Sequence, residues 1–199
     1  MDMKELLIAT GNPGKVREFK RLLFSTSLRL LTPNDVGLTL TVDESGDTYL
    51  ENATLKAVAF ATASGLPCLA DDSGLEVDAL GGRPGLRSAR FGGGELDDRG
   101  RNALLLRELA GIPMSQRSAR YRAVVVVVVG DADMRSFEGV QKGYIAESCQ
   151  GAGGFGYDPV FSVDGTRSQA QLSPEEKDLI SHRGRACRLA ARFIGERAQ

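Results

Sequence analysis

The sequence is poor in the residues from which disulfide frameworks and thiolate metal sites are built. It has three cysteines and one histidine among 199 residues. Cys68, Cys149 and Cys187 lie far apart, are odd in number and form no CxxC pair. This spacing argues against a disulfide framework and against a zinc site with thiolate ligands. We expect all three cysteines to be small, buried apolar residues.

The sequence also lacks an excess of either charge. Its 25 Lys and Arg residues against 26 Asp and Glu residues give a formal net charge of −1. It therefore has no overall positive field that would gather polymeric nucleic acid or an anionic membrane, and a small-molecule substrate fits better. The early apolar run at 6–9 is too short for a signal-peptide core or a membrane span. We expect a cytoplasmic protein with one domain over residues 1–199.

Periodicity and turn residues predict strands that alternate with helices. The predicted strands are 5–9, 66–70, 119–129 and 135–147, the last broken near Gly139 and Gly143 or folded into a hairpin. The predicted helices are 13–24, 48–64, 97–110 and a segment from 174 to the C-terminus, interrupted near Ser181. Six consecutive valines in 119–129 indicate a central strand covered on both faces. The sequence thus predicts an α/β fold with helices on both faces of a mixed sheet.

The first candidate site is the turn at 10–15, TGNPGK, between the first strand and the first helix. Asn12 is a good helix N-cap, and Pro13 suits the first helical position. A helix start carries roughly half a positive charge, and Lys15 can reach the same anion from the first turn. The spacing is neither that of a Walker A loop nor the GxGxxG of dinucleotide-binding enzymes. Taken alone, the turn is equally consistent with a structural helix cap beside a lysine.

The second candidate site is the adjacent pair Asp71 and Asp72, which we expect at the end of the apolar strand 66–70. Two neighbouring carboxylates resist burial unless a cation or hydrogen bonds compensate them, and hard oxygen ligands suit Mg²⁺. The alternative is a turn in which one aspartate bonds to the backbone. Glu44 is a further candidate ligand, or else an ordinary solvated loop residue.

Two further segments are candidates for contact with a nucleoside. In the segment 155–159, FGYDP, two aromatic residues flank a glycine. A base could stack there, although two aromatics that close the edge of a core fit the same pattern. Lys177 and the run Ser181-His182-Arg183 form the other segment. A lone histidine is more often structural, and neighbouring arginines can simply solvate a helix face.

These segments, in this order, resemble the inosine/xanthosine triphosphate pyrophosphatase family, which hydrolyses deaminated purine nucleoside triphosphates to the monophosphate and pyrophosphate. The resemblance spans nearly the whole chain, in IATGNPGKVREF, YLENATLKA, LADDSGLEVDALGGRPGLRSARF, GGFGYDPVF and LSPEEKDLISHRGRA. It implies a two-lobed α/β fold with a long central mixed β-sheet flanked by helices, an active-site cleft between the lobes, a homodimer and a Mg²⁺ cofactor. Gln171, where relatives often have an acid, and the run Gly92-Gly93-Gly94 depart from the pattern.

The resemblance also implies a role for each candidate residue. The phosphates would be bound by Thr10, Gly11, Asn12, Pro13, Gly14, Lys15 and Lys56. Asp72 would be the general base and a metal ligand, Glu44 a second metal ligand, and Ser73 a substrate contact. The nucleoside pocket would be formed by Phe155, Gly156, Tyr157, Asp158, Lys177, His182 and Arg183.

The implied reaction is hydrolysis of ITP, dITP or XTP to the nucleoside monophosphate and pyrophosphate. Two other functions compete with it. The glycine-rich opening suggests a dinucleotide-dependent oxidoreductase, but that opening lacks the GxGxxG spacing. A binding module that holds a nucleotide without turnover would use the same phosphate and base contacts. The aspartate pair and the two lysines favour catalysis over that alternative.

Overall fold

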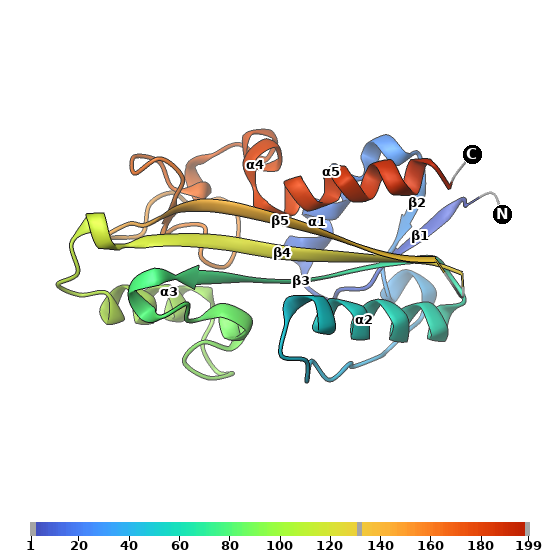
Figure 1. Cartoon of the computed structure of the whole chain (residues 1–199), viewed down its shortest axis with the longest axis horizontal. Coiled ribbons are helices and arrows are strands. Elements are labelled where there is room, and N and C mark those ends of the chain that lie inside the picture. The colour runs from blue at the N-terminus through green and yellow to red at the C-terminus, as the bar shows by residue number, and fades with distance from the viewer. Residues whose placement is uncertain (1–2, 131–132, 198–199) are drawn as a thin grey trace. The chain divides into compact units, whose positions relative to one another are not determined.

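A six-stranded sheet runs through the fold (Figure 1). The computed structural model describes residues 3–130 and 133–197. The strands are β1 (Glu5–Ile8), β2 (Arg29–Leu31), β3 (Cys68–Val77), β4 (Ser118–Val129), β5 (Asp133–Ile145) and β6 (Phe161–Ser162), in the order β2-β1-β3-β4-β5-β6. β1 pairs in parallel with β2 and β3, whereas β5 pairs antiparallel with β6. The sheet is therefore mixed, and the predicted α/β class is confirmed.

Five α-helices lie in the described residues: α1 (Pro13–Leu22), α2 (Tyr49–Ser64), α3 (Asp98–Glu108), α4 (Pro174–Ile180) and α5 (His182–Gly195). Ser181, with extended backbone angles, separates α4 from α5, which confirms the predicted interruption. In residues 3–130 and 133–197, none of these helices combines the length and the apolar character that crossing a bilayer requires.

The chain divides into two compact units and passes between them several times. Unit 1 comprises Met1–Asp72, Ala123–Gly139 and Arg183–Gln199, and unit 2 comprises Ser73–Arg122 and Val140–His182. β3, β4 and β5 each contribute residues to both units. One boundary falls between Asp72 and Ser73, and another between His182 and Arg183. Neighbouring candidate site residues therefore belong to different units.

Capping side chains fix where the helices α1 and α2 begin. Asn12 is the N-cap of α1, and its side chain accepts hydrogen bonds from the backbone of the first turn. Thr48 and Glu51 form a capping box at the start of α2, as their spacing predicts. Gly65 ends α2 in the left-handed conformation, with φ of 68°, which glycine adopts without steric cost.

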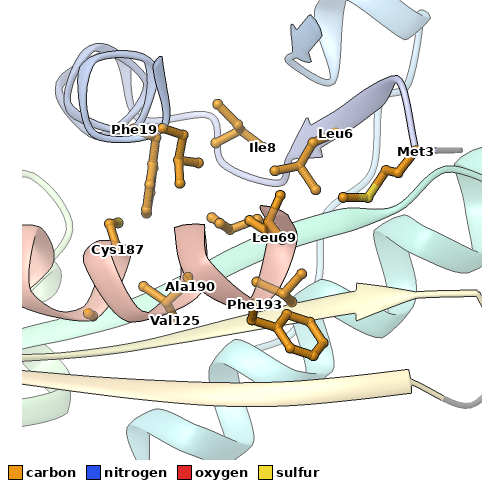
Figure 2. Close-up of a cluster of buried hydrophobic side chains, with 13 residues drawn as sticks. Met3, Leu6, Ile8, Phe19, Leu69, Val125, Cys187, Ala190 and Phe193 are labelled. Carbon is orange, nitrogen blue, oxygen red and sulfur yellow. The ribbon is translucent and has the colours of Figure 1, made fainter. Parts of the chain in front are cut away.

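The core of unit 1 lies between the strands and the helices α1 and α5 (Figure 2). Leu6 and Ile8, two residues apart on β1, point to the same face of the sheet, as the period of a strand requires. They belong to one buried cluster with Phe19 of α1, Val125 of β4 and Cys187 of α5. This cluster attaches α1 and α5, both of which carry candidate site residues, to the sheet.

The valine run of β4 is covered on both faces, as predicted. Val125 and Val127 belong to the cluster with α1 and α5. Val124, Val126 and Val128 are also buried. Because alternate residues of a strand point to opposite faces, this second set faces the side of the strands on which Figure 1 shows α2. Burial on both faces explains why apolar and polar residues do not alternate along this strand.

Unit 2 has a core of its own, in which α3 packs on β3 and β4. Leu75 of β3 and Leu105 of α3 are fully buried members of this cluster. Tyr121 of β4 contacts Phe161 of β6, with ring centroids 4.6 Å apart and planes tilted by 52°. Tyr157, from the predicted nucleoside segment, also belongs to this cluster. The core of unit 2 therefore extends to the candidate site.

The predicted end of the strand at residue 70 is wrong. β3 continues to Val77, so Asp71 and Asp72 lie inside the strand instead of after it. The prediction looked to Mg²⁺ or to a turn for compensation of the two carboxylates, and not to basic side chains. Lys15 and Lys56 lie within ion-pair distance of them, and buried carboxylates are tolerated in a strand when such partners are present.

The predicted break in 135–147 is also wrong, because β5 is continuous from Asp133 to Ile145. A Cβ atom on Gly143 would collide with the backbone oxygen of Ser162, so this glycine permits close pairing with β6 and does not break the strand. Sequence analysis missed β2 and β6, whose lengths of three and two residues give no periodic signal. Cys149 is exposed, contrary to expectation, whereas Cys68 and Cys187 are buried.

The substitution Phe19→Ala should lower the free energy of unfolding by about 3–5 kcal/mol, because it opens a cavity at a core position. Phe24→Ala is the matched control: Phe24 is 84% exposed, whereas Phe19 is 0% exposed. The control should change the free energy of unfolding by less than about 0.5 kcal/mol. Urea unfolding followed by circular dichroism measures both values. Equal losses would contradict the assignment of Phe19 to the core.

Candidate active site

The turn before α1 is organised around the side chain of Asn12. Its Oδ1 accepts hydrogen bonds from the backbone N–H groups of Gly14, at 2.8 Å, and Lys15, at 3.1 Å. The Asn12 N–H donates to Thr10 Oγ1 at 3.2 Å. The cap therefore occupies two amides that the sequence left open for a phosphate. The positive end of the helix and the Lys15 ammonium are the features that attract an anion here.

A buried ion-pair network joins α1, β3 and α5 within unit 1. Lys15 Nζ lies 3.0 Å from Asp71 Oδ1. Arg183 donates to Asp71 Oδ2 from Nε, at 3.2 Å, and from Nη2, at 3.1 Å. Its Nη1 donates to Glu18 Oε2. The side chains of Asp71 and Arg183 are 0% and 3% exposed. Two basic and two acidic side chains thus balance their charges away from water.

The network fixes the ionisation state of Asp71. Burial alone would raise the pKa of this carboxyl, but the charges of Lys15, Arg183 and Lys56 outweigh burial and hold the pKa well below its ordinary range. Burial lowers the pKa of the Lys15 ammonium, and the neighbouring Asp71 opposes that effect. Asp71 is therefore a charged partner for basic side chains and a poor acceptor of protons.

Asp72 points to the other side of β3 and meets different partners, because consecutive residues of a strand face opposite sides. Asn52 Nδ2, on α2, donates to Asp72 Oδ2 at 3.2 Å. Lys56 Nζ, one helical turn further on, lies 3.9 Å from Asp72 Oδ1. Burial raises the pKa of Asp72 despite the opposing charges of Lys56 and Lys15. Asp72 is thus the better proton acceptor of the two aspartates.

Lys56 also brings Glu44 close to Asp72. Its Nζ lies 2.6 Å from Glu44 Oε1 and 3.9 Å from Asp72 Oδ1, so one cation contacts both carboxylates. Within residues 3–130 and 133–197, no three His, Cys, Asp or Glu side chains are grouped as a metal site. Mg²⁺ commonly takes only one or two carboxylates and completes its coordination with water and substrate phosphates. Glu44 and Asp72 fit that set of ligands.

Asn52 is a site residue that sequence analysis did not select. It is 3% exposed, and its amide bonds to two segments, because Oδ1 accepts from the Gly46 N–H at 2.9 Å while Nδ2 donates to Asp72. A Cβ on Gly46 would lie 2.6 Å from a side-chain carbon of α2, so only glycine lets the loop that carries Glu44 pack this closely. The available signal was the spacing of Asn52 and Lys56, which puts both on one face of α2.

Lys177 and residues 155–158, which we call the FGYD segment, form a cluster in unit 2. Asp158 Oδ2 accepts a hydrogen bond from the Phe155 N–H at 2.8 Å and is ion-paired with Lys177. Lys177 Nζ lies 5.0 Å from the centroid of the Phe155 ring. Tyr157 is only 4% exposed, and its hydroxyl donates to the backbone oxygen of Ser88 at 2.8 Å. The Phe155 side chain is half-buried, whereas Tyr157 is a core residue.

His182 and Arg183 are adjacent in sequence but belong to different units. His182 is 4% exposed and stacks on Tyr121, with ring centroids 4.6 Å apart and planes 9° apart. Arg183 bonds to Asp71 and Glu18 in unit 1. Ser73, the first residue of unit 2, is half-buried in β3. The structure thus groups Lys177 with the FGYD segment and groups Arg183 with the residues around Lys15.

Comparison with known proteins finds similarity over almost the whole chain. The model of the Ham1 family matches residues 6–193. This chain belongs to the Ham1 family. The Ham1-family chain is 44% identical over 193 residues to a protein of Bacillus subtilis named dITP/XTP pyrophosphatase, and the match covers 96% of this chain and 98% of the relative.

Two further comparisons agree with the Ham1 assignment. The dITP/XTP pyrophosphatase of Thermus thermophilus is 49% identical over 185 residues, which cover 92% of the Ham1-family chain and 88% of the relative. A solved HAM1 protein from Coxiella burnetii matches with a TM-score of 0.86 and 36% identity, over 98% of this chain and 100% of that one. The family resemblance that the sequence motifs indicate is confirmed.

In this Ham1-family chain, Asp71→Ala should lower the free energy of unfolding by about 3–5 kcal/mol, because it leaves Lys15 and Arg183 buried without their shared partner. Glu5→Ala removes one carboxylate from the pair of Glu5 with Arg29, whose side chains are 36% and 74% exposed. That control should cost less than about 1 kcal/mol. Urea unfolding measures both changes, and a loss for Asp71→Ala as small as the control would contradict the proposed balance of charges.

Proposed function

We propose that this chain hydrolyses the non-standard purine nucleoside triphosphates ITP, dITP and XTP to the nucleoside monophosphate and pyrophosphate. The proposal is carried by the 44% identity, over 96% of the chain, to a protein named dITP/XTP pyrophosphatase. The buried Asp72 beside Asn52 and Lys56 supports catalysis. Burial raises the pKa of Asp72, which suits a proton acceptor and favours turnover over a module that only binds.

Asp72 is the proposed general base. Its neighbour Asp71 is excluded from this role because Lys15 and Arg183 hold its pKa low and occupy its oxygens. A water molecule beside the Asp72 carboxylate would give up a proton to it while attacking the α-phosphorus. The bond between the α-phosphorus and the bridging oxygen breaks, and pyrophosphate leaves with that oxygen. The water oxygen remains on the monophosphate.

Lys15 and Lys56 are proposed to stabilise the negative charge that grows on the departing pyrophosphate. Their side chains are 16% and 13% exposed. Electrostatic stabilisation of a transition state is strongest where water is largely excluded and the charges are already in place. Lys15 also lies at the positive end of α1. The other proposed substrate contacts on this side are Thr10, Gly11, Asn12, Pro13, Gly14 and Ser73.

We propose Mg²⁺ as the cofactor, with Glu44 and Asp72 as its protein ligands. When bound, Mg²⁺ supplies neutralisation of the charge on the phosphate oxygens. The contacts of Lys56 with both carboxylates support the assignment, because they hold the two groups near a single positive charge. The hydrogen bond from Gly46 to Asn52 holds the loop that carries Glu44 against α2.

Selection of the base is assigned to Phe155, Gly156, Tyr157, Asp158, Lys177, His182 and Arg183. Hypoxanthine and xanthine carry a 6-oxo acceptor, whereas adenine presents a 6-amino donor. A donor that faces a donor leaves both unpaired, at a cost of about 1–3 kcal/mol. Lys177 and His182 carry donors in unit 2. Arg183 is bonded to Asp71 and Glu18, so its contact with a base would compete with those ion pairs.

We further propose that the protein is a cytoplasmic homodimer, with one domain over residues 1–199. Neither polymeric nucleic acid nor a membrane is a proposed partner. The nearly balanced charge, with a formal net value of −1, supports a small-molecule substrate over an extended polyanion. The family resemblance is the basis for the dimer.

Incubation of the purified protein with ITP and Mg²⁺ tests the proposed function. The expected products are IMP and pyrophosphate in equal amounts, because the α-phosphorus is the site of attack. Ion-exchange chromatography separates the nucleotides, and a coupled assay measures pyrophosphate. If IDP and orthophosphate were the primary products, the assignment of the α-phosphorus would be overturned.

The control for this assay is Asp72→Asn, which preserves the size of the side chain and removes the base. Turnover should fall by about 10²–10⁴-fold, the range expected for loss of a general base. Binding of ITP, measured by calorimetry in the absence of turnover, should persist. Turnover close to that of the unmodified protein would require a different base.

A further inference from the structure

Helix α3 binds both backbone polar groups of Gly156, and so both of the peptide groups that flank its Cα. The Gly156 N–H donates to Asp98 Oδ2 at 2.7 Å. The Gly156 carbonyl oxygen accepts from Asn102 Nδ2 at 2.9 Å. Asp98 and Asn102 are four residues apart, so both side chains lie on one face of the helix. The donor and the acceptor of a single residue in the FGYD segment are therefore both satisfied by α3.

Both residues that hold Gly156 have contacts of their own. Asn102 is 3% exposed, so its amide cannot turn away from Gly156 without leaving a buried amide nitrogen without a hydrogen bond. Arg101 Nη2 lies 2.6 Å from Asp98 Oδ1, while the other oxygen of Asp98 accepts from Gly156. The Asp98 side chain is 47% exposed, so Asn102 is the more firmly fixed of the two.

Gly156 adopts a backbone conformation that favours glycine. Its φ is +62°, in the left-handed region that other residues rarely adopt. A Cβ atom added there would meet no atom within 4 Å, so the constraint at this position concerns the backbone and not space. Phe155, on one side of the peptide, carries the half-buried ring, and Asp158, two residues beyond, pairs with Lys177.

The two hydrogen bonds from α3 do more than attach the loop to the fold. Tyr157 already anchors the segment, because its buried ring lies in the core of unit 2 and its hydroxyl bonds to Ser88. The bonds from α3 also orient the two peptide groups that flank Gly156. The first of these, between Phe155 and Gly156, adjoins the residue that carries the ring, so its rotation would move the ring and disturb the contact of Lys177 with it.

We propose that Asp98 and Asn102 are positioning residues for recognition of the purine base. They fix the two peptide groups that flank Gly156 and thereby hold the Phe155 ring, and the Lys177 ammonium beside it, in the arrangement that accepts a 6-oxopurine. The inference rests on the proposed function, because it assigns these residues to the base end of that substrate. Neither residue needs to touch the base.

The test compares Asn102→Ala and Asp98→Ala with the unmodified protein. Asn102→Ala should raise the Michaelis constant for ITP by about tenfold, because Gly156 loses a buried partner. Asp98→Ala should raise it by a smaller factor, because the Asp98 side chain is 47% exposed. The turnover number should stay within about twofold, because Asp72, Lys15 and Lys56 are not altered. The preference for ITP over GTP should fall in both variants. Asp98→Asn keeps an oxygen that accepts from the Gly156 N–H and should restore the original Michaelis constant.

The matched control is Asp97→Ala. Asp97 caps the same helix, since its Oδ1 accepts from the Gly100 N–H at 2.8 Å, but it is not bonded to Gly156 in the described contacts. This variant should lower the melting temperature and leave the Michaelis constant unchanged. If Asp97→Ala and Asn102→Ala raised the Michaelis constant equally, α3 would act only through stability and the proposal would be overturned.

Binding of IMP, measured by calorimetry, separates this inference from the proposed function. An unmodified protein that fails to release IMP and pyrophosphate from ITP would refute the function, whatever its affinity for IMP. About tenfold weaker binding of IMP by Asn102→Ala, but not by Asp97→Ala, supports the inference. Equal affinities in all three proteins, or no binding by the unmodified one, overturn it. Gly156→Ala, which changes only the preferred backbone conformation, provides a second variant and should weaken binding similarly.

Discussion

The neutralisation of Asp71 is the interaction on which the rest of the site depends. Asp71 and Asp72 are consecutive residues of β3, so the pleat of the strand directs them to opposite sides. Lys15 and Arg183 compensate Asp71 on one side, and Lys56 approaches Asp72 on the other. Two identical side chains thereby acquire different properties. Asp71 is kept ionised by its partners, whereas burial raises the pKa of Asp72.

The same balance determines where a phosphate can be held. Lys15 is buried next to Asp71, and its position at the start of α1 follows from the Asn12 cap. Without the Asp71 carboxylate, the ammonium of Lys15 and the guanidinium of Arg183 would repel one another in a region that water scarcely enters. The lysine that we propose for phosphate binding therefore has a structural carboxylate beside it, which β3 supplies directly before the proposed base.

The candidate site residues are divided between the two units. The candidate phosphate and metal residues Lys15, Glu44, Lys56 and Asp72 belong to unit 1, and the FGYD segment, Lys177 and His182 belong to unit 2. The chain passes from one unit to the other directly after Asp72 and directly after His182. The bonds of α3 to Gly156 therefore lie wholly within unit 2, and the contacts of the proposed general base with Asn52 and Lys56 lie wholly within unit 1.

Sequence reasoning succeeded where the determining interactions are local. The Asn12 cap and the Thr48 capping box each depend on residues within one helical turn, and the structure confirms both. It failed for β3, because the strand continues through Asp71 only with the help of Arg183, which lies 112 positions away. Asn52 and Asp98 were missed for the same reason, since their partners Asp72 and Gly156 lie 20 and 58 positions away. Such pairings are fixed by tertiary packing, and local spacing shows at most that Asn52 and Lys56 share a face of α2.

The family motifs identified some site residues that local patterns could not. They selected Lys56 and Glu44 as members of one site, and the structure gives these residues a direct contact of 2.6 Å. They also grouped Arg183 with the nucleoside residues, whereas the structure bonds it to Asp71 and Glu18. A motif indicates that a residue matters for the site, but the ion pairs that a buried guanidinium makes depend on which charges the fold brings to it.

The central claim is that a water molecule activated by Asp72 attacks the α-phosphorus. Hydrolysis of ITP in water enriched in ¹⁸O, followed by mass spectrometry of both products, tests it most directly. The account predicts that one ¹⁸O atom enters the phosphate of IMP and none enters pyrophosphate. Label in pyrophosphate and not in IMP would show attack at the β-phosphorus and would contradict the account.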